Sequence, residues 1–195
     1  MYAIRTTPGF IIDSRPTGEA GKLLSIFTRD LGLVLATAQG IRFEKSKLRY
    51  HTQEYSFGNF SFVKGKEFWR LTSAAEGEGE SQNIHTKTQE FFARLALLLR
   101  RLLHGEEPHP ELFDVLEGSR QFIISSPALT DDQMKTLESL VVLRTLHSLG
   151  YIGKDAGLTQ YVQSTEITPT LLEEASKSRT LINQHINKAF KESQL

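Results

Sequence analysis

The chain has 195 residues, with 23 basic and 23 acidic side chains and no cysteine, which excludes disulfide bonds, a thiol nucleophile and a cysteine-based zinc site. The charges are unevenly distributed: residues 1–76 carry eleven Lys and Arg against seven Asp and Glu, leaving the remainder net acidic. This asymmetry suggests that a polyanion would meet the first part of the chain, although scattered surface charges would give the same count. No cofactor or metal is expected.

The sequence also indicates where the protein resides. Its start, MYAIRTTPGF, lacks the basic and then apolar run of a secretory signal. The longest apolar run, FFARLALLLRRLL at 91–103, is interrupted by Arg94 and is shorter than the ~20 residues that span a bilayer. We therefore expect a cytoplasmic protein that does not bind a membrane.

Residues 1–76 have the pattern of a β domain. Apolar or alternating segments at 10–12, 22–28, 33–38, 55–63 and 67–74 predict five short strands, and turn residues separate them. The pair Gly58-Asn59 is expected to place a bulge or turn in the fourth strand. Five short strands in this length predict a small closed barrel of the OB type, and an SH3-like barrel would leave much the same pattern.

The polar, acidic, glycine-containing residues 77–82 predict a linker, and the period then becomes helical over residues 83–195. Residues 91–103 predict a nearly buried helix, and Pro110 begins the next. Thr130 and Gln133 form a capping box for a helix over 132–149. A terminal helix starts either at Thr168-Pro169 or at Thr170 with Glu173. The fold class is therefore α+β, with an N-terminal five-stranded barrel and a C-terminal helical bundle.

The sequence has no constellation that would support catalysis. His104 and His109 are five residues apart with a proline between them, which is the wrong spacing for two metal ligands on one helical face. Gly77 and Gly79 lack the preceding strand and the following Lys-Ser or Lys-Thr of a phosphate-binding loop. We expect a protein that is not an enzyme.

The segment at 40–51, GIRFEKSKLRYH, is the strongest candidate for a binding site. It holds the cations Arg42, Lys45, Lys47 and Arg49 together with two aromatic residues. Cations neutralise phosphates, and aromatic faces stack on unpaired bases, although a basic loop is often only a solvated loop. Lys64, Lys66 and Arg70 could extend the same surface. Trp69 is expected in the core, facing away from Phe68 and Arg70.

Several stretches, in this order, resemble the RecO family of recombination-mediator proteins. They are GFIIDSRPTGEAGKLLSIFTRDLGLVLATAQGIR, then SKLRYHTQEYSFGNFSFVKGKEFWRLTSA, then GEEPHPELFDVLE at 105–117 and VVLRTLHSLGY at 141–151. The resemblance implies an OB-fold followed by a helical domain. It also implies binding of single- and double-stranded DNA, annealing of complementary strands, and loading of the RecA recombinase onto DNA coated by single-strand binding protein.

The resemblance implies partners and sites as well. The partners would be a RecR-like protein and the acidic C-terminal tail of the single-strand binding protein. By position, the DNA-contacting residues would be Arg42, Lys45, Lys47 and Arg49, with Lys22, Arg29, Lys64, Lys66 and Arg70 as further candidates. Many members carry a four-cysteine zinc module after the LGY segment, whereas residues 150–157 contain no cysteine here.

A separate hypothesis concerns Arg144 and the binding of a partner's tail. At helical spacing its neighbours are Val141, Leu140 and Leu137, so it projects from an apolar face. Either its stem packs and its head reaches solvent, or it lies at the rim of an apolar pocket suited to the partner's tail. Arg100 and Arg101 are similar candidates. Two alternatives to DNA mediation remain open: a protein-docking OB-fold adaptor and an RNA-binding module.

Overall fold

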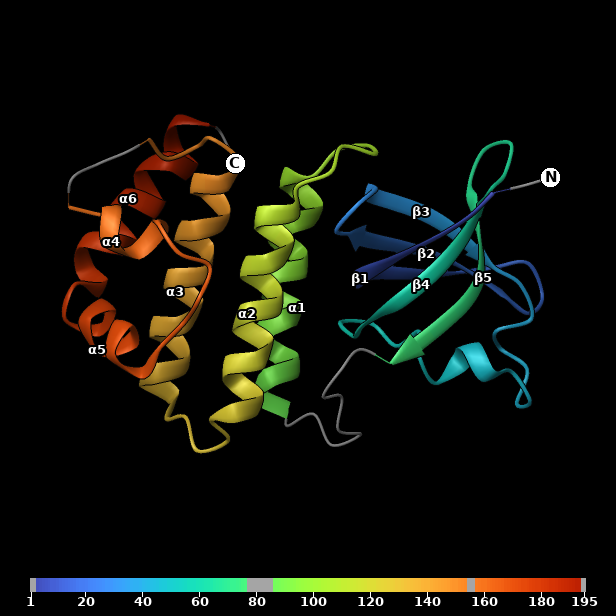
Figure 1. The fold of residues 1–195 in the computed structure, drawn as a ribbon, viewed down its shortest axis with the longest axis horizontal. Coiled ribbons are helices and arrows are strands. Elements are labelled where there is room, and N and C mark those ends of the chain that lie inside the picture. The colour runs from blue at the N-terminus through green and yellow to red at the C-terminus, as the bar shows by residue number, and fades with distance from the viewer. Residues whose placement is uncertain (1–2, 77–85, 154–156, 194–195) are drawn as a thin grey trace. The chain divides into compact units, whose positions relative to one another are not determined.

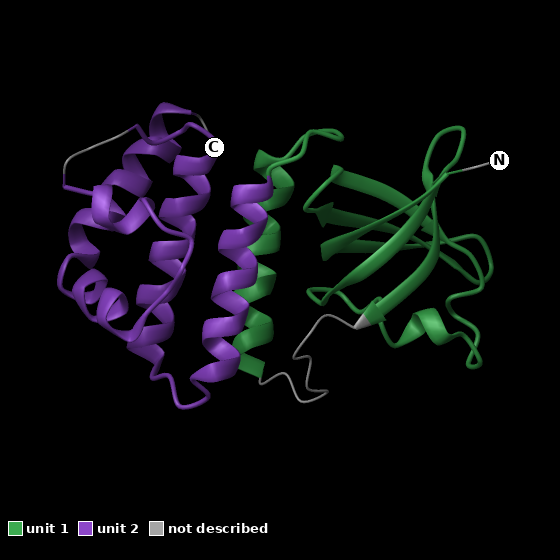
Figure 2. Cartoon of the chain, in the orientation of Figure 1, with its two compact units in different colours: residues 1–109 green, residues 110–195 purple. Residues whose placement is uncertain are grey.

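The computed structural model describes residues 3–76, 86–153 and 157–193 (Figure 1). By their contacts these residues form two compact units, 1–109 and 110–195 (Figure 2). The predicted linker at 77–82 lies outside the described residues, and the predicted domain boundary at residue 76 stays a prediction. Within the described residues, every helix is too short or too polar to cross a membrane.

The first unit contains a closed five-stranded barrel. Its strands are β1 (Ile4–Thr17), β2 (Gly21–Thr28), β3 (Gly32–Ala38), β4 (Phe57–Lys64) and β5 (Trp69–Glu76). They are ordered β1-β2-β3-β5-β4, and the one parallel pairing joins β3 to β5. A short 3-10 helix, η1 (Lys47–Arg49), lies between β3 and β4. This Greek-key barrel confirms the predicted OB-fold.

Strand β1 is much longer than the predicted segment 10–12. Its first half pairs with β4 and its second half with β2, and the register shifts between Ile11 and Asp13. The bulge expected at Gly58-Asn59 is wrong, because both residues pair regularly with β1 and with β5. Glycine is needed at 58 for space: a Cβ there would lie 2.6 Å from the Ala75 carbonyl oxygen.

Most of the described aromatic residues of this unit are buried. Phe57, Phe60 and Phe62 of β4 are buried. Trp69 is buried and packs edge-on to Phe62, while Arg70 faces outward, as the alternation of β5 predicts. These rings therefore stabilise the barrel and are not available to a ligand.

Helix α1 (Thr86–Leu102) packs against one end of the barrel. The ring of Phe92 contacts those of Phe10 and Phe57, with centroids 5.6 and 5.1 Å apart. The loop after α1 then meets β3, where the Leu33 N–H donates to the Gly105 carbonyl at 3.1 Å. These contacts explain why α1 belongs to the same compact unit as the barrel.

The second unit is helical and is organised around α3. Its helices are α2 (Pro110–Ser125), α3 (Asp131–Ser148), α4 (Thr159–Val162), α5 (Pro169–Lys177) and α6 (Arg179–Glu192). α3 packs against all four others, and Leu137, Leu140 and Val141 on it are fully buried. The capping box of Thr130 and Gln133 is confirmed.

The C-terminal helix differs from the prediction. Thr168 caps α5 by accepting from the Leu171 N–H, which settles the choice between the two predicted starts. The expected single helix is divided at Ser178 into α5 and α6. The division lets both pieces pack on α3, through Ala175 of α5 and Ile182 of α6, which are fully buried.

Candidate nucleic-acid interface

Three connections lie on the side of the barrel away from α1: the β1–β2 turn and residues 40–51 are close to each other, and the β4–β5 turn projects from another edge (Figure 1). Lys22 at the start of β2 is paired with Ala38 at the end of β3, and Thr37 is paired with Arg70 of β5. The Arg42 N–H donates to the Ala20 carbonyl at 3.1 Å, which ties the connection after β3 to the β1–β2 turn. We call this region the cationic end; it comprises the β1–β2 turn, residues 40–51 and the β4–β5 turn.

The basic segment, residues 40–51, is anchored to the barrel. Ile41 is buried in the barrel core and Leu48 packs against it. The Thr52 hydroxyl donates to the Leu48 carbonyl at 2.6 Å, next to η1. Lys47 and Arg49 lie on η1 and are exposed. The cations of this segment are therefore held on an ordered backbone.

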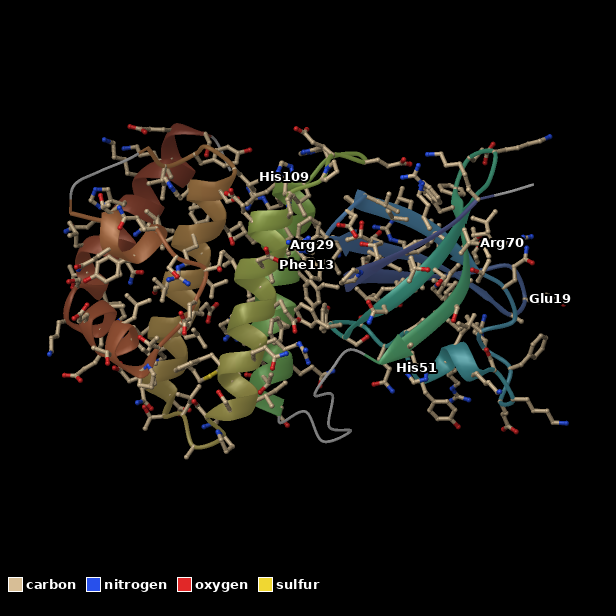
Figure 3. All side chains as sticks on the ribbon, viewed as in Figure 1. Glu19, Arg29, His51, Arg70, His109 and Phe113 are labelled. Atoms are coloured by element: carbon tan, nitrogen blue, oxygen red, sulfur yellow. The ribbon has the colours of Figure 1, made fainter. Side chains whose placement is uncertain are left out.

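Most of the predicted DNA-contacting cations gather at the cationic end. Among the described residues, their side chains form no ion pair, and all but the half-buried Lys22 are exposed. They are Lys22, Arg42, Lys45, Lys47, Arg49, Lys66 and Arg70. Figure 3 shows Arg70 near Glu19 of the β1–β2 turn at this end of the barrel. Unpaired cations keep their full charge for an anionic ligand.

Arg29 is not part of this cluster. It lies in the β2–β3 turn, where its N–H donates to the Pro8 carbonyl, and Figure 3 shows it at the other end of the barrel from Arg70. Its guanidinium lies 3.8 Å from the Asp30 carboxylate. The tertiary fold separates Arg29 from the other cations because β2 runs the length of the barrel between the two turns.

Lys64 is neutralised within the protein. Its ammonium lies 2.7 and 2.8 Å from the two carboxylate oxygens of Glu106 and 4.6 Å from the centre of the Trp69 ring. The Trp69 indole N–H donates to the same carboxylate at 2.9 Å. The hydrogen bond from Lys64 holds the pKa of Glu106 below its ordinary value. Sequence reasoning missed Glu106 because it follows α1, far along the chain from Lys64.

Exposed apolar side chains accompany the cations. Phe43 and Tyr50 of the basic segment are exposed. Leu35 on the outer face of β3 and Phe68 in the β4–β5 turn are exposed as well. The outward position of Phe68 is expected from its place beside the buried Trp69, whereas no sequence signal indicates Leu35. In OB-folds the outer face of β2 and β3, together with the β1–β2 and β4–β5 loops, forms the usual ligand-binding surface.

Of the three arginines proposed for a partner's tail, Arg100 and Arg101 belong to the first unit and Arg144 belongs to the second. Arg100 pairs with Asp13 of β1 at 3.4 Å, and Arg101 is exposed. Arg144 is only 2% exposed, and burial lowers its pKa to about 10.

The guanidinium of Arg144 points into the protein. It donates to the carbonyls of Tyr161, Thr165 and Glu166 at 2.7, 3.0 and 3.1 Å. This geometry makes Arg144 a support for the backbone around α4 and does not place it at the rim of a pocket. Its predicted role in tail binding stays a prediction.

The fold and this surface define an OB-barrel protein with a cationic end that also exposes aromatic rings, a combination typical of barrels that bind single-stranded nucleic acids. The sequence model of the family described as "Recombination protein O N terminal" matches residues 1–76.

Relatives named "DNA repair protein RecO" match beyond the barrel. The protein of Alkaliphilus metalliredigens is 33% identical over 178 residues, covering 90% of this chain and 69% of the relative. That of Desulfitobacterium hafniense is 30% identical over 145 residues, covering 72% of this chain and 50% of the relative. That of Acaryochloris marina is 36% identical over 111 residues, covering 55% and 37%. The chain belongs to the RecO family, and its match spans about half the length of the Desulfitobacterium relative.

Proposed function

We propose that this protein acts in DNA repair by binding single-stranded DNA at the cationic end of its barrel, without catalysing a reaction. The observation that carries the proposal is the gathering of seven cations, none of them ion-paired among the described residues, at one end of an OB-fold. Asp30, beside Arg29, lies in the β2–β3 turn, whereas Glu106 contacts Lys64 and Trp69 at the base of the β4–β5 turn.

Electrostatics determine how this binding responds to salt. Each phosphate that a cation neutralises releases a counterion, so the logarithm of the affinity falls with the logarithm of the salt concentration by about 0.7 per contact on single strands. Four contacts from the basic segment would therefore contribute about 3 to that slope. Binding of double-stranded DNA follows from the same cations, because phosphates are accessible in both forms of DNA.

The finer activities are supported by family membership. We propose that the protein anneals complementary strands and helps to load a recombinase onto DNA covered by single-strand binding protein. Its partners would be a RecR-like protein and the tail of the single-strand binding protein, in the cytoplasm. The relatives' shared name, "DNA repair protein RecO", supports the repair context.

The test is a titration of a fluorescent single-stranded oligonucleotide at several salt concentrations. In the test variant Arg42, Lys45, Lys47 and Arg49 are changed to Gln. In the control variant four exposed lysines of the helical unit are changed to Gln; these are Lys135, Lys177, Lys188 and Lys191. We expect the test variant to bind at least about tenfold more weakly with a salt slope lower by about 3, and the control to bind as the wild type.

Equal affinities of the test variant and the wild type, or equal slopes, would overturn the assignment of DNA binding to this segment. Annealing is measured separately, by following the quenching that occurs when two labelled complementary strands pair. Stronger binding of single-stranded RNA in competition would instead favour the RNA-binding alternative.

A further inference from the structure

Two aromatic rings of the basic segment face solvent while its aliphatic side chains are buried. Phe43 is 64% exposed and Tyr50 is 69% exposed. By contrast, Ile41 is buried in the barrel core and Leu48 packs against it. Rings of this size usually bury most of their surface, so two such rings in one short segment need an explanation.

The backbone around both rings is fixed by hydrogen bonds. The Phe43 N–H donates to the Gly40 carbonyl at 3.2 Å, and the Phe43 carbonyl accepts from the Ser46 N–H at 3.0 Å. Tyr50 follows η1 directly, where the His51 N–H donates to the Leu48 carbonyl at 3.2 Å. These turns fix the backbone positions from which the two exposed side chains project.

Gly40 contributes to the placement of the first ring. Its φ of 66° lies in the left-handed region, and a Cβ at this position would lie 3.4 Å from the Phe43 ring. Glycine therefore allows the chain to leave β3 in a tight turn that passes alongside the ring. The exposure of Phe43 is thus a property of this turn and not of a loose loop.

The charges around the rings indicate what would cover them. Arg42 and Glu44 flank Phe43 along the chain, Lys45 follows Glu44, and Arg49 precedes Tyr50. The cations outnumber the carboxylate by three to one, and none of the three cations forms an ion pair among the described residues. A hydrophobic protein partner would have to cover these cations with few groups to pair with them. A nucleic-acid strand offers a binding group for each, because its phosphates pair with cations and its bases stack on aromatic rings.

We infer that Phe43 and Tyr50 stack on unpaired bases and make the cationic end selective for single-stranded over double-stranded DNA. This inference rests on the proposed DNA binding and adds the residues that distinguish the two forms of DNA. In a duplex the base faces are stacked on each other and closed to side chains, while the phosphates stay accessible. The cations can therefore bind both single- and double-stranded DNA, whereas the rings can stack only on the bases of single-stranded DNA.

The experiment compares Phe43→Leu, Tyr50→Leu and the double variant on a single strand containing 2-aminopurine and on the matching duplex. Leucine keeps an apolar side chain but removes the aromatic face. We expect each single variant to bind the single strand roughly fivefold or more weakly, to lose the fluorescence change of stacked 2-aminopurine, and to bind the duplex as the wild type does. The salt slope stays that of the wild type, because no cation is removed.

Two further variants are controls. Tyr50→Phe keeps the ring and should retain single-strand affinity, and Tyr151→Leu removes an exposed ring in the helical unit and should change nothing. Equal losses on single strand and duplex, or no loss on either, would overturn the inference. Neither result touches the proposed function, which fails if the wild type does not bind DNA, or if the four-cation variant binds with the affinity or the salt slope of the wild type.

Discussion

Arg144 offers the sharpest test of how the helical unit is held together. In Arg144→Met an unbranched apolar stem is kept about as far as Nε, but the guanidinium and its three hydrogen bonds to the carbonyls of Tyr161, Thr165 and Glu166 are lost. The Tyr161 carbonyl is then left buried without this donor. The other two carbonyls lie on exposed residues, where water can replace the guanidinium.

The magnitude follows from two opposing contributions. Three hydrogen bonds from a charged donor contribute roughly 4–9 kcal/mol, at about 1.5–3 kcal/mol each. Against this, burial lowers the pKa of Arg144 from 12.5 to about 10, a penalty on the charged form of roughly 3 kcal/mol. Water can replace part of the hydrogen bonding at the carbonyls of Thr165 and Glu166. We therefore expect Arg144→Met to lower the free energy of unfolding by about 2 kcal/mol, near the lower end of the difference between the two contributions.

The assay is urea denaturation of the full chain followed by far-ultraviolet circular dichroism, with hydrogen exchange of the amides at 161–167. These amides should exchange faster in Arg144→Met. Arg101→Met, the same chemical change at an exposed position, should alter stability by less than about 0.5 kcal/mol. A loss in Arg144→Met no larger than in Arg101→Met, with unchanged exchange, would refute the supporting role. Wild-type affinity of this variant for the partner's tail would also remove Arg144 from tail binding.

Three further predictions concern the barrel unit and are measured by urea denaturation. Glu106→Gln should lower the free energy of unfolding by about 0.5 kcal/mol at neutral pH. The difference from the wild type should vanish as the pH falls through the lowered pKa of Glu106, because a carboxyl whose folded pKa is lowered stabilises only while ionised. A pH-independent difference, or an equal effect in Glu107→Gln, would contradict this prediction. Gly32→Ala should lower the free energy of unfolding by roughly 2–4 kcal/mol, since Gly32 has a φ of 70° and an added Cβ would overlap the Glu107 backbone. Gly18→Ala, where φ is 56° and the added Cβ meets open space, should lower it by roughly 1–2 kcal/mol. Similar losses at both positions would show that the loop after α1 does not pack on Gly32. Phe92→Ala should cost roughly 3–5 kcal/mol and expose the α1 amides to exchange, and retained exchange protection in α1 would show that Phe92 does not hold this helix to the barrel.

Much of the candidate site could be predicted from sequence because its signal is local. The basic segment combines four cations and two aromatic rings within ten residues, and the structure holds this segment as one anchored unit. The inward position of Trp69 and the outward position of Arg70 follow from the alternation of a strand. In each case neighbouring positions along the chain determine which way a side chain points.

The pairing of charges could not be predicted in this way. Lys64 and Lys66 look alike in sequence, yet only Lys64 meets a carboxylate in the described structure, and that carboxylate is supplied by Glu106. Arg29 has the sequence context of a loop cation but lies at the other end of the barrel from Arg70 (Figure 3). Which cations keep their charge for a ligand depends on contacts between distant segments.

By itself, the sequence determined the class of each half of this protein: short β segments with turns for the barrel, helical periodicity and a capping box for the bundle. These signals arise from backbone geometry and from the spacing of apolar side chains, which act over a few residues. Only the tertiary structure decided that β1 pairs with both β2 and β4, that α1 packs against the barrel, and that Arg144 is buried against the backbone around α4. These features depend on which apolar surfaces cover one another, and that choice is made by packing across the whole unit.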